Sequence, residues 1–369
     1  MITEQAPRER AAGPGAHYMY GLDLLRVLCA AAVVYVHIMG WALAHDYNSL
    51  IIEVVEGAIV RPLHLAERLG FVGLCSFLLI TGVVISHVSA KETSGQFLSR
   101  RGVRLAPALW IAVPLAWLLA LAGLNGTSST PDVRDLLLNM VLLNHTVPGS
   151  VAVLGVTWTL LCQVVFYLFV AATIPIMRRR PWLPAAIAAS VLSVLASLVA
   201  VVPWDATGSM RMFATFLPII FIGQVIGLTR SGRITPLAGM VLAGVHLWLG
   251  VRAVLSWPES HHAADYARTL VLLVLVLLLL TRADGRIARS PVVRGVAKRT
   301  YAIYLLHMPL MIGTLELTAD HIGFYASLAL ATGLLVIGVE LVRRCVDEPI
   351  TATFRRWENN RAARTGAPR

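Results

Sequence analysis

Long apolar runs separated by short basic segments dominate the chain. Ten of these runs reach the roughly 20 residues that a helix needs to cross the hydrocarbon core of a bilayer. They are predicted near residues 22–44, 69–90, 105–124, 151–177, 182–202, 212–229, 235–255, 264–282, 300–318 and 323–345. The pattern predicts an all-α fold, a polytopic bundle of about ten transmembrane helices.

The composition supports this prediction and indicates whether lipid or nucleic acid is the expected partner. Of the 369 residues, 57% are hydrophobic and 14% are charged, and the mean hydropathy is +0.73. An ordinary soluble domain is less apolar, so we expect the lipid bilayer as the surroundings of this chain. The net charge of +11 does not indicate a nucleic-acid partner, because the basic residues lie in short clusters between the apolar runs. The four cysteines show no spacing that predicts a metal site.

The positions of lysine and arginine predict the orientation, because these residues gather in the cytoplasmic segments of membrane proteins. If the N-terminus lies in the cytoplasm, only six of the 31 lysines and arginines would lie on the outer side of the membrane. They are Arg61, Arg68, Arg134, Arg211, Arg252 and Arg268. We therefore expect a multi-pass protein of the plasma membrane with both termini in the cytoplasm. Residues 1–17 and 357–369 are rich in Arg, Ala, Gly and Pro and are expected to be disordered. They would flank a membrane domain at 18–356.

Two ionisable residues interrupt the first apolar run. Arg26 and His37 are eleven residues apart, which at about 100° per residue places both on one helix face, about 16 Å apart. An arginine at the centre of a membrane helix costs roughly 2.5–3.5 kcal/mol, so such residues usually serve function. Alternatively, the Arg26 side chain extends to the membrane–water interface, and His37 only forms a hydrogen bond between two helices. A signal peptide cleaved after 42–44 is a further alternative, which Asp23 and these two residues argue against.

Six motifs occur in order along the chain. They are GLDLLRVLCAAAVVYVH (21–37), GLCSFLLITGVVIS (73–86), FLSRRGVRLAPALW (97–110), TWTLLCQVVFYL (157–168), TYAIYLLHMPL (300–310) and VDEPI (346–350). Together they resemble acyltransferase family 3, integral-membrane O-acyltransferases that use acyl-CoA, over about residues 18–356. Gln163 departs from the family, in which many members carry Glu, and an amide can only hydrogen bond.

The resemblance implies an acyltransferase that moves an acyl group, expected to be acetyl, from cytoplasmic acyl-CoA to a hydroxyl. The acceptor would be a glycan, a lipid-linked sugar or a secondary metabolite such as a macrolide. Acyl-CoA would be a co-substrate, with no tightly bound cofactor. The Arg-x10-His pair of the family corresponds to Arg26 and His37, the expected catalytic residues. Histidine, with an ordinary pKa near 6.5, suits deprotonation of the acceptor hydroxyl, and Arg26 would stabilise the developing oxyanion.

Further residues are expected to bind the two substrates. Arg101 and Arg104 are three apart on one helical face, and guanidinium groups match phosphates well, so they would hold coenzyme A. Alternatively, they only anchor the helix at the cytoplasmic surface. The remaining candidates are Trp158, Gln163 and Tyr167 on one predicted helix and Tyr304 and His307 on another. For these five residues, substrate binding competes with ordinary helix packing.

Two other functions fit the same residues. In a transporter or flippase for a polar or acylated molecule, buried Arg and His would form a substrate path or a proton relay. A catalytically inactive acyl-lipid sensor would fit Gln163. Incorporation of labelled acetyl into a product would separate the enzyme from both.

Overall fold

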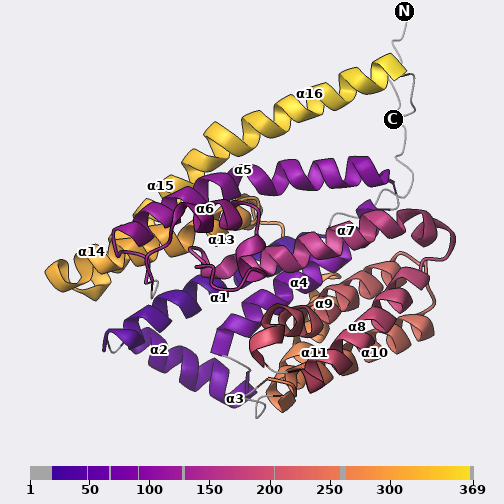
Figure 1. Ribbon diagram of the computed structural model, residues 1–369, viewed down its shortest axis with the longest axis horizontal. Coiled ribbons are helices and arrows are strands. Elements are labelled where there is room, and N and C mark those ends of the chain that lie inside the picture. The colour runs from indigo at the N-terminus through magenta and orange to yellow at the C-terminus, as the bar shows by residue number, and fades with distance from the viewer. Residues whose placement is uncertain are drawn as a thin grey trace, which may run out of the picture.

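The computed structural model describes residues 19–47, 49–65, 68–89, 91–126, 129–202, 204–257 and 263–365. No β-strand occurs in this part of the chain, which folds into packed helices (Figure 1). Nine helical segments within these ranges are long and apolar enough to cross a membrane. The predicted all-α, polytopic fold is therefore confirmed. The predicted disorder of residues 1–17 lies outside the described residues.

The nine segments match nine of the predicted spans. They are α1 (Tyr20–Ala44), α4 (Arg68–Val88), α5 (Ser94–Leu121), α7 (Trp158–Arg179), α8 (Leu183–Val201), α9 (Trp204–Arg230), α10 (Pro236–Val254), the stretch Thr300–Ile322 and α15 (Phe324–Val342). The tenth predicted span is occupied by α11 (Ala263–Leu280), whose 18 residues directly follow a stretch outside the description.

The helix α11 also connects the two ends of the bundle. Near its start, Arg268 donates a hydrogen bond to His64 O, and just after its end Thr281 O accepts one from Arg230.

We call one end of the bundle the basic end. It holds the N-termini of α1 and α5 and the C-termini of α4, α7 and α9. It corresponds to the side that the sequence predicts to be cytoplasmic.

Shorter helices fill the connections and the C-terminal region. They are α2 (Leu50–Val55), a π-helix at Glu56–Val60, α3 (Arg61–Leu63), α6 (Val133–Met140), 3-10 turns at Leu143–His145 and Gly155–Thr157, α12 (Pro291–Ala297), a π-helix at Arg343–Asp347 and α16 (Glu348–Thr365). The helix α16 corrects the expectation that disorder begins at residue 357. Arg100 of α5 donates hydrogen bonds to both carboxylate oxygens of Glu358, at 3.1 and 3.2 Å, and this pairing fastens α16 to the bundle.

The segment before α7 is organised around Asp135 of α6. Its carboxylate accepts hydrogen bonds from the backbone N–H of Asp132 at 3.1 Å and of Val151 at 2.9 Å, and from the Ser150 hydroxyl at 2.9 Å. Burial raises the pKa of Asp135, but these hydrogen bonds to the charged form outweigh it and leave the pKa below its ordinary value. Asn139 adds hydrogen bonds to Val151 and Val153, so the chain returns to the start of α7 in a fixed path.

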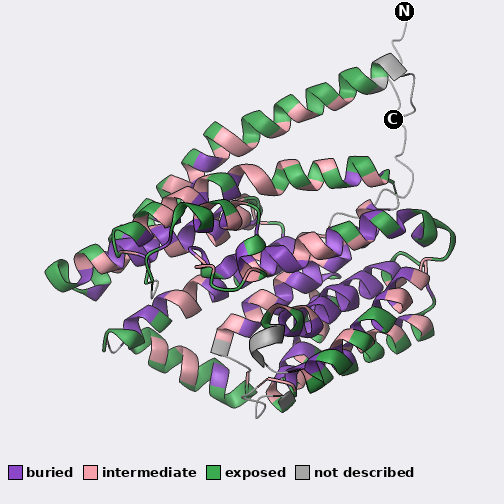
Figure 2. Ribbon diagram, viewed as in Figure 1, coloured by how far each residue is buried: buried purple, intermediate pink, exposed green. Residues whose placement is uncertain are grey.

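The helices α4 and α9 touch through their backbones. A Cβ atom on Gly223 would lie 2.1 Å from Leu79 O, and one on Gly82 would lie 2.0 Å from Ile220 O. Small residues allow the two backbones to come this close. The resulting van der Waals packing holds the helices together within lipid, where the hydrophobic effect does not drive helix association. Figure 2 shows α9 buried at the centre, whereas α16 and the outer face of α10 are exposed.

The stretch Thr300–Ile322 changes its helical pitch midway. It begins as α13 (Thr300–His307), widens into a π-helix at Met308–Ile312 and continues as α14 (Gly313–Ile322). Pro309 has no N–H to donate to Leu305 O, so the ordinary helical bond is lost at this point. Single π-turns within helices are frequent at functional sites, and this one directly follows His307.

Candidate functional site

A cavity opens between α1, α4, α5, α7 and α13 at the level of the basic end. It encloses about 830 Å³, including open space at its mouth. Six of the residues predicted to form the site line it together: Arg26, Arg101, Arg104, Gln163, Tyr167 and Tyr304. Apolar residues of α4 form much of the remaining wall, including Leu74, Phe77 and Ile80. Residues from distant parts of the sequence thus surround one space.

Three of these cavity residues are arginines, and each has a different environment. Arg26 pairs with Asp23 at 2.7 Å, and 23% of its side chain is exposed. Arg101 is 13% exposed, its guanidinium lies 5.5 Å from the Phe97 ring centre, and its buried Nε has no hydrogen-bond partner among the described residues. Arg104 is exposed and forms no hydrogen bond or ion pair with the described part of the chain. Donor capacity for an anion therefore remains at the cavity.

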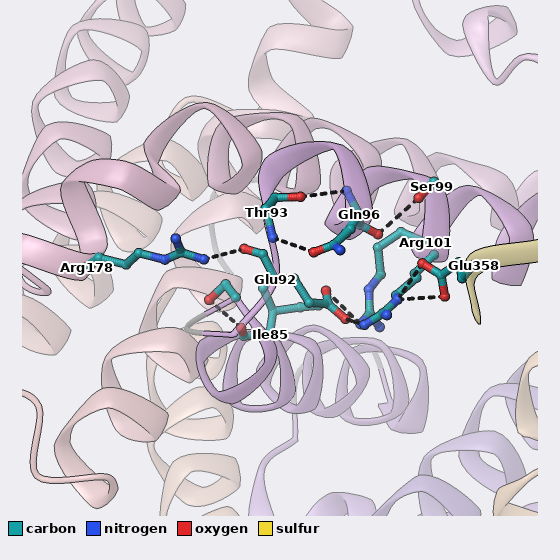
Figure 3. Close-up of polar contacts among 10 residues, drawn as sticks. Ile85, Glu92, Thr93, Gln96, Ser99, Arg101, Arg178 and Glu358 are labelled. Carbon is teal, nitrogen blue, oxygen red and sulfur yellow. Dashed lines mark hydrogen bonds and ion pairs between the residues drawn. The ribbon is translucent and has the colours of Figure 1, made fainter. Parts of the chain in front are cut away.

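A polar cluster positions the N-terminal part of α5, which carries two of the arginines (Figure 3). The capping box of Thr93 and Gln96 starts the helix. The buried Glu92 carboxylate accepts a hydrogen bond from Arg100 at 2.7 Å and lies 3.9 Å from Arg101. Arg178 at the end of α7 donates to Glu92 O at 2.8 Å. The cluster holds α5 against α7 and keeps Arg101 turned toward the cavity.

Tyrosines and a glutamine form the polar wall opposite α4. Tyr167 donates to Gln163 Oε1 at 3.5 Å, a long hydrogen bond that leaves the amide nitrogen available for a ligand. Tyr304 donates to Val156 O and lies within hydrogen-bond distance of the Thr159 hydroxyl. Tyr301 donates to Leu105 O at 2.7 Å and so joins α13 to α5.

His37 and His307 lie beside each other, beyond the residues that line the cavity. Their ring centres are 5.2 Å apart, and the His307 ring lies 6.2 Å from that of Tyr304. His307 is fully buried, and its Nδ1 lies 2.8 Å from Tyr304 O and 3.2 Å from Ile303 O. Because a carbonyl only accepts, Nδ1 must carry the proton. When the ring is neutral, its Nε2 is therefore the unprotonated nitrogen, and this atom has no partner among the described residues.

Trp158 differs from Gln163 and Tyr167, the other two candidates on α7. Its ring packs 4.7 Å from Phe216 of α9, and it does not line the cavity. Five residues at about 100° each amount to about 500°, which turns Trp158 about 140° from Gln163, so the two do not share a face.

Four further polar residues, which were not predicted from the sequence, also line the cavity. Thr81, Thr159, Thr300 and Tyr301 contribute hydroxyl groups. Tyr301 stands three residues before Tyr304 on the same helix, and this spacing could have identified it. The threonines carry no comparable signal, because most membrane threonines bond to their own helix, as Thr81 does to Phe77 O at 2.9 Å.

A sequence model described as an acyltransferase domain, that of acyltransferase family 3, matches residues 19–341. The chain belongs to acyltransferase family 3. It is a multi-pass membrane acyltransferase, and the family resemblance noted in its motifs is confirmed. No curated protein matches the chain. No solved structure matches it either.

Proposed function

We propose that this acyltransferase moves an acetyl group from acetyl-CoA to a hydroxyl group of a glycan, a lipid-linked sugar or a secondary metabolite such as a macrolide. The observation that carries the proposal is a cavity at the basic end with three arginines, next to two adjacent histidines deeper in the bundle. The enzyme would act in the plasma membrane, with the donor arriving from the cytoplasm.

The arginines suit the donor. Coenzyme A carries phosphate groups at one end and the thioester at the other, so it needs cations at the mouth and a narrower path inward. Arg101 and Arg104 lie on the helix that borders the mouth and would hold phosphates through charge-assisted hydrogen bonds. Arg26, on the face of α1 that also carries His37, would stabilise the oxyanion that forms on the thioester carbonyl.

The histidines suit the acceptor. One imidazole nitrogen would take the proton of the acceptor hydroxyl as its oxygen attacks the thioester carbon. The C–S bond then breaks, and the departing thiolate of coenzyme A takes up the proton. His37 is our proposed base, and His307 lies close enough to share that role because its Nε2 is unprotonated and unpartnered. Gln163 and Tyr167 would position the substrates by hydrogen bonds.

Transfer of labelled acetyl tests the proposal. Inverted membranes containing the parent chain are incubated with labelled acetyl-CoA and an extract of the source cells as the acceptor pool. We expect protein-dependent label in products from which mild alkali releases it, as it does from O-acetyl esters. Membranes without the protein serve as the control. If the parent chain produces no alkali-labile label, the proposed O-acetyl transfer is wrong, and a transporter or sensor would fit the residues better.

Donor binding has its own test within the same assay. Replacing Arg104 with Ala should raise the KM for acetyl-CoA by about tenfold or more, since hydrogen bonds to charged groups contribute about 1.5–3 kcal/mol. Arg180→Ala is the matched control, because Arg180 is exposed at the end of α7 and does not line the cavity. An unchanged KM for acetyl-CoA in Arg104→Ala would show that Arg104 only helps to orient the protein in the membrane.

A further inference from the structure

A second cavity lies at the basic end and meets the first. It encloses about 1550 Å³, including open space, between the start of α1, the end of α4, the end of α9 and residues 281–284. Arg26 and Val84 line both cavities, so the two spaces adjoin at these side chains. Two of the arginines of this outer cavity, Arg230 and Arg282, stand outside all six sequence motifs.

The charges of the outer cavity leave two cations in excess. Its carboxylates are already engaged, Asp23 with Arg26 at 2.7 Å and Asp284 with Arg289, whose Nε lies 2.6 Å away. Arg230 and Arg282 form no ion pair with a carboxylate of the described residues, and they are close enough to interact electrostatically with each other. Two like charges side by side are unfavourable unless an anion lies between them. The Arg230 guanidinium is held in place by its hydrogen bond to Thr281 O at 3.2 Å.

We infer that the outer cavity binds the nucleotide end of the acyl-CoA donor, with Arg230 and Arg282 on its 3′-phosphate. This inference rests on the proposed function, because it assumes an acyl-CoA donor. A phosphate monoester carries a charge of about −1.5 to −2 at pH 7 and matches a pair of guanidinium groups. The bulky nucleotide fits the larger, outer space, and the donor continues past Arg26 and Val84 into the inner cavity. There Arg101 and Arg104 would hold the diphosphate, and the slender pantetheine arm would lie beyond them. The thioester thereby points toward Tyr304 and the histidines.

Binding measurements on the purified full chain in detergent test this assignment, with CoA and dephospho-CoA as the probes. Dephospho-CoA lacks only the 3′-phosphate. The parent chain should bind CoA about 10- to 100-fold more tightly than dephospho-CoA. Arg230→Ala and Arg282→Ala should each lose most of this preference while binding dephospho-CoA as the parent does. Arg286→Ala is the control, since Arg286 is exposed four residues after Arg282 and does not line the cavity.

The outcomes separate this inference from the proposed function. A parent chain that binds no CoA would refute both. A parent that binds CoA but does not prefer it to dephospho-CoA, or arginine variants that keep the preference, would refute the nucleotide site alone. A lipid headgroup is the other possible source of the phosphate, so the measurement is repeated in nanodiscs with and without anionic phospholipid. Competition between anionic lipid and CoA that disappears in Arg282→Ala would assign the site to lipid and overturn the inference.

Discussion

The adjacent histidines allow a double-variant test of the proposed chemistry. His37→Ala and His307→Gln each remove one imidazole from a pair whose ring centres are 5.2 Å apart. General acid–base catalysis typically contributes about 10²–10⁴-fold, so each single variant should lose at least about 10² in kcat. A factor of 10² corresponds to about 2.7 kcal/mol of transition-state stabilisation. The KM for acetyl-CoA should change little, because neither ring lines the arginine cavity.

The double variant decides whether the two rings act together. Independent contributions would multiply to a loss of about 10⁴, or about 5.4 kcal/mol. If the histidines act as one unit, the double variant should be little worse than the poorer single variant. Turnover is measured with labelled acetyl-CoA on purified protein, after size-exclusion chromatography has shown that each variant is folded. His321→Ala is the control, since His321 is exposed on α14.

Three results would refute this reasoning. Near-parental turnover in His37→Ala would remove His37 from the mechanism. Strict multiplication of the single losses in the double variant would show that the adjacency of the rings has no catalytic meaning. A loss confined to KM would instead make the histidines substrate-binding residues.

Three further predictions concern the arginine, the helix seam and the loop. Arg26→Lys should strongly impair turnover, because lysine keeps the charge but loses the planar guanidinium, whereas an Arg26 that only reaches the interface would tolerate lysine. Gly223→Ala should lower the unfolding temperature, since its Cβ would lie 2.1 Å from Leu79 O and overpacking costs about 1–3 kcal/mol; Gly244→Ala, whose Cβ meets nothing within 4 Å, should not. Asp135→Asn should destabilise the protein by about 1–3 kcal/mol near pH 7, measured by thermal unfolding. Because folding lowers the pKa of Asp135, that stabilisation exists above the ordinary carboxyl pKa and is lost as the pH falls below it, so the parent and Asp135→Asn should then converge.

The sequence predicted the spans well because the length and hydropathy of a membrane helix are local properties. It also placed Arg26 and His37 on one face, because their spacing is close to a whole number of turns. The contact between His37 and His307 could not be predicted from the sequence, because this contact depends on how helices 270 residues apart pack. Likewise, the outer cavity is built from the ends of four segments, each of which alone looks like an ordinary basic flank. The helix over residues 357–365 was not expected, because the pairing of Glu358 with Arg100 joins segments about 260 residues apart and leaves no local pattern in the sequence.

The backbone contact between α4 and α9 has a mechanical consequence. Where Gly82 and Gly223 bring main chains together, no layer of side chains can change rotamer to absorb a displacement, and the two helices must move as one body. The helices α5 and α16 are joined instead by the ion pair between Arg100 and Glu358, which salt weakens and which can re-form in a new position. A donor as large as acyl-CoA would therefore lie against a stationary wall formed by α4 and α9, while α5, which carries Arg101 and Arg104, can shift to accommodate it.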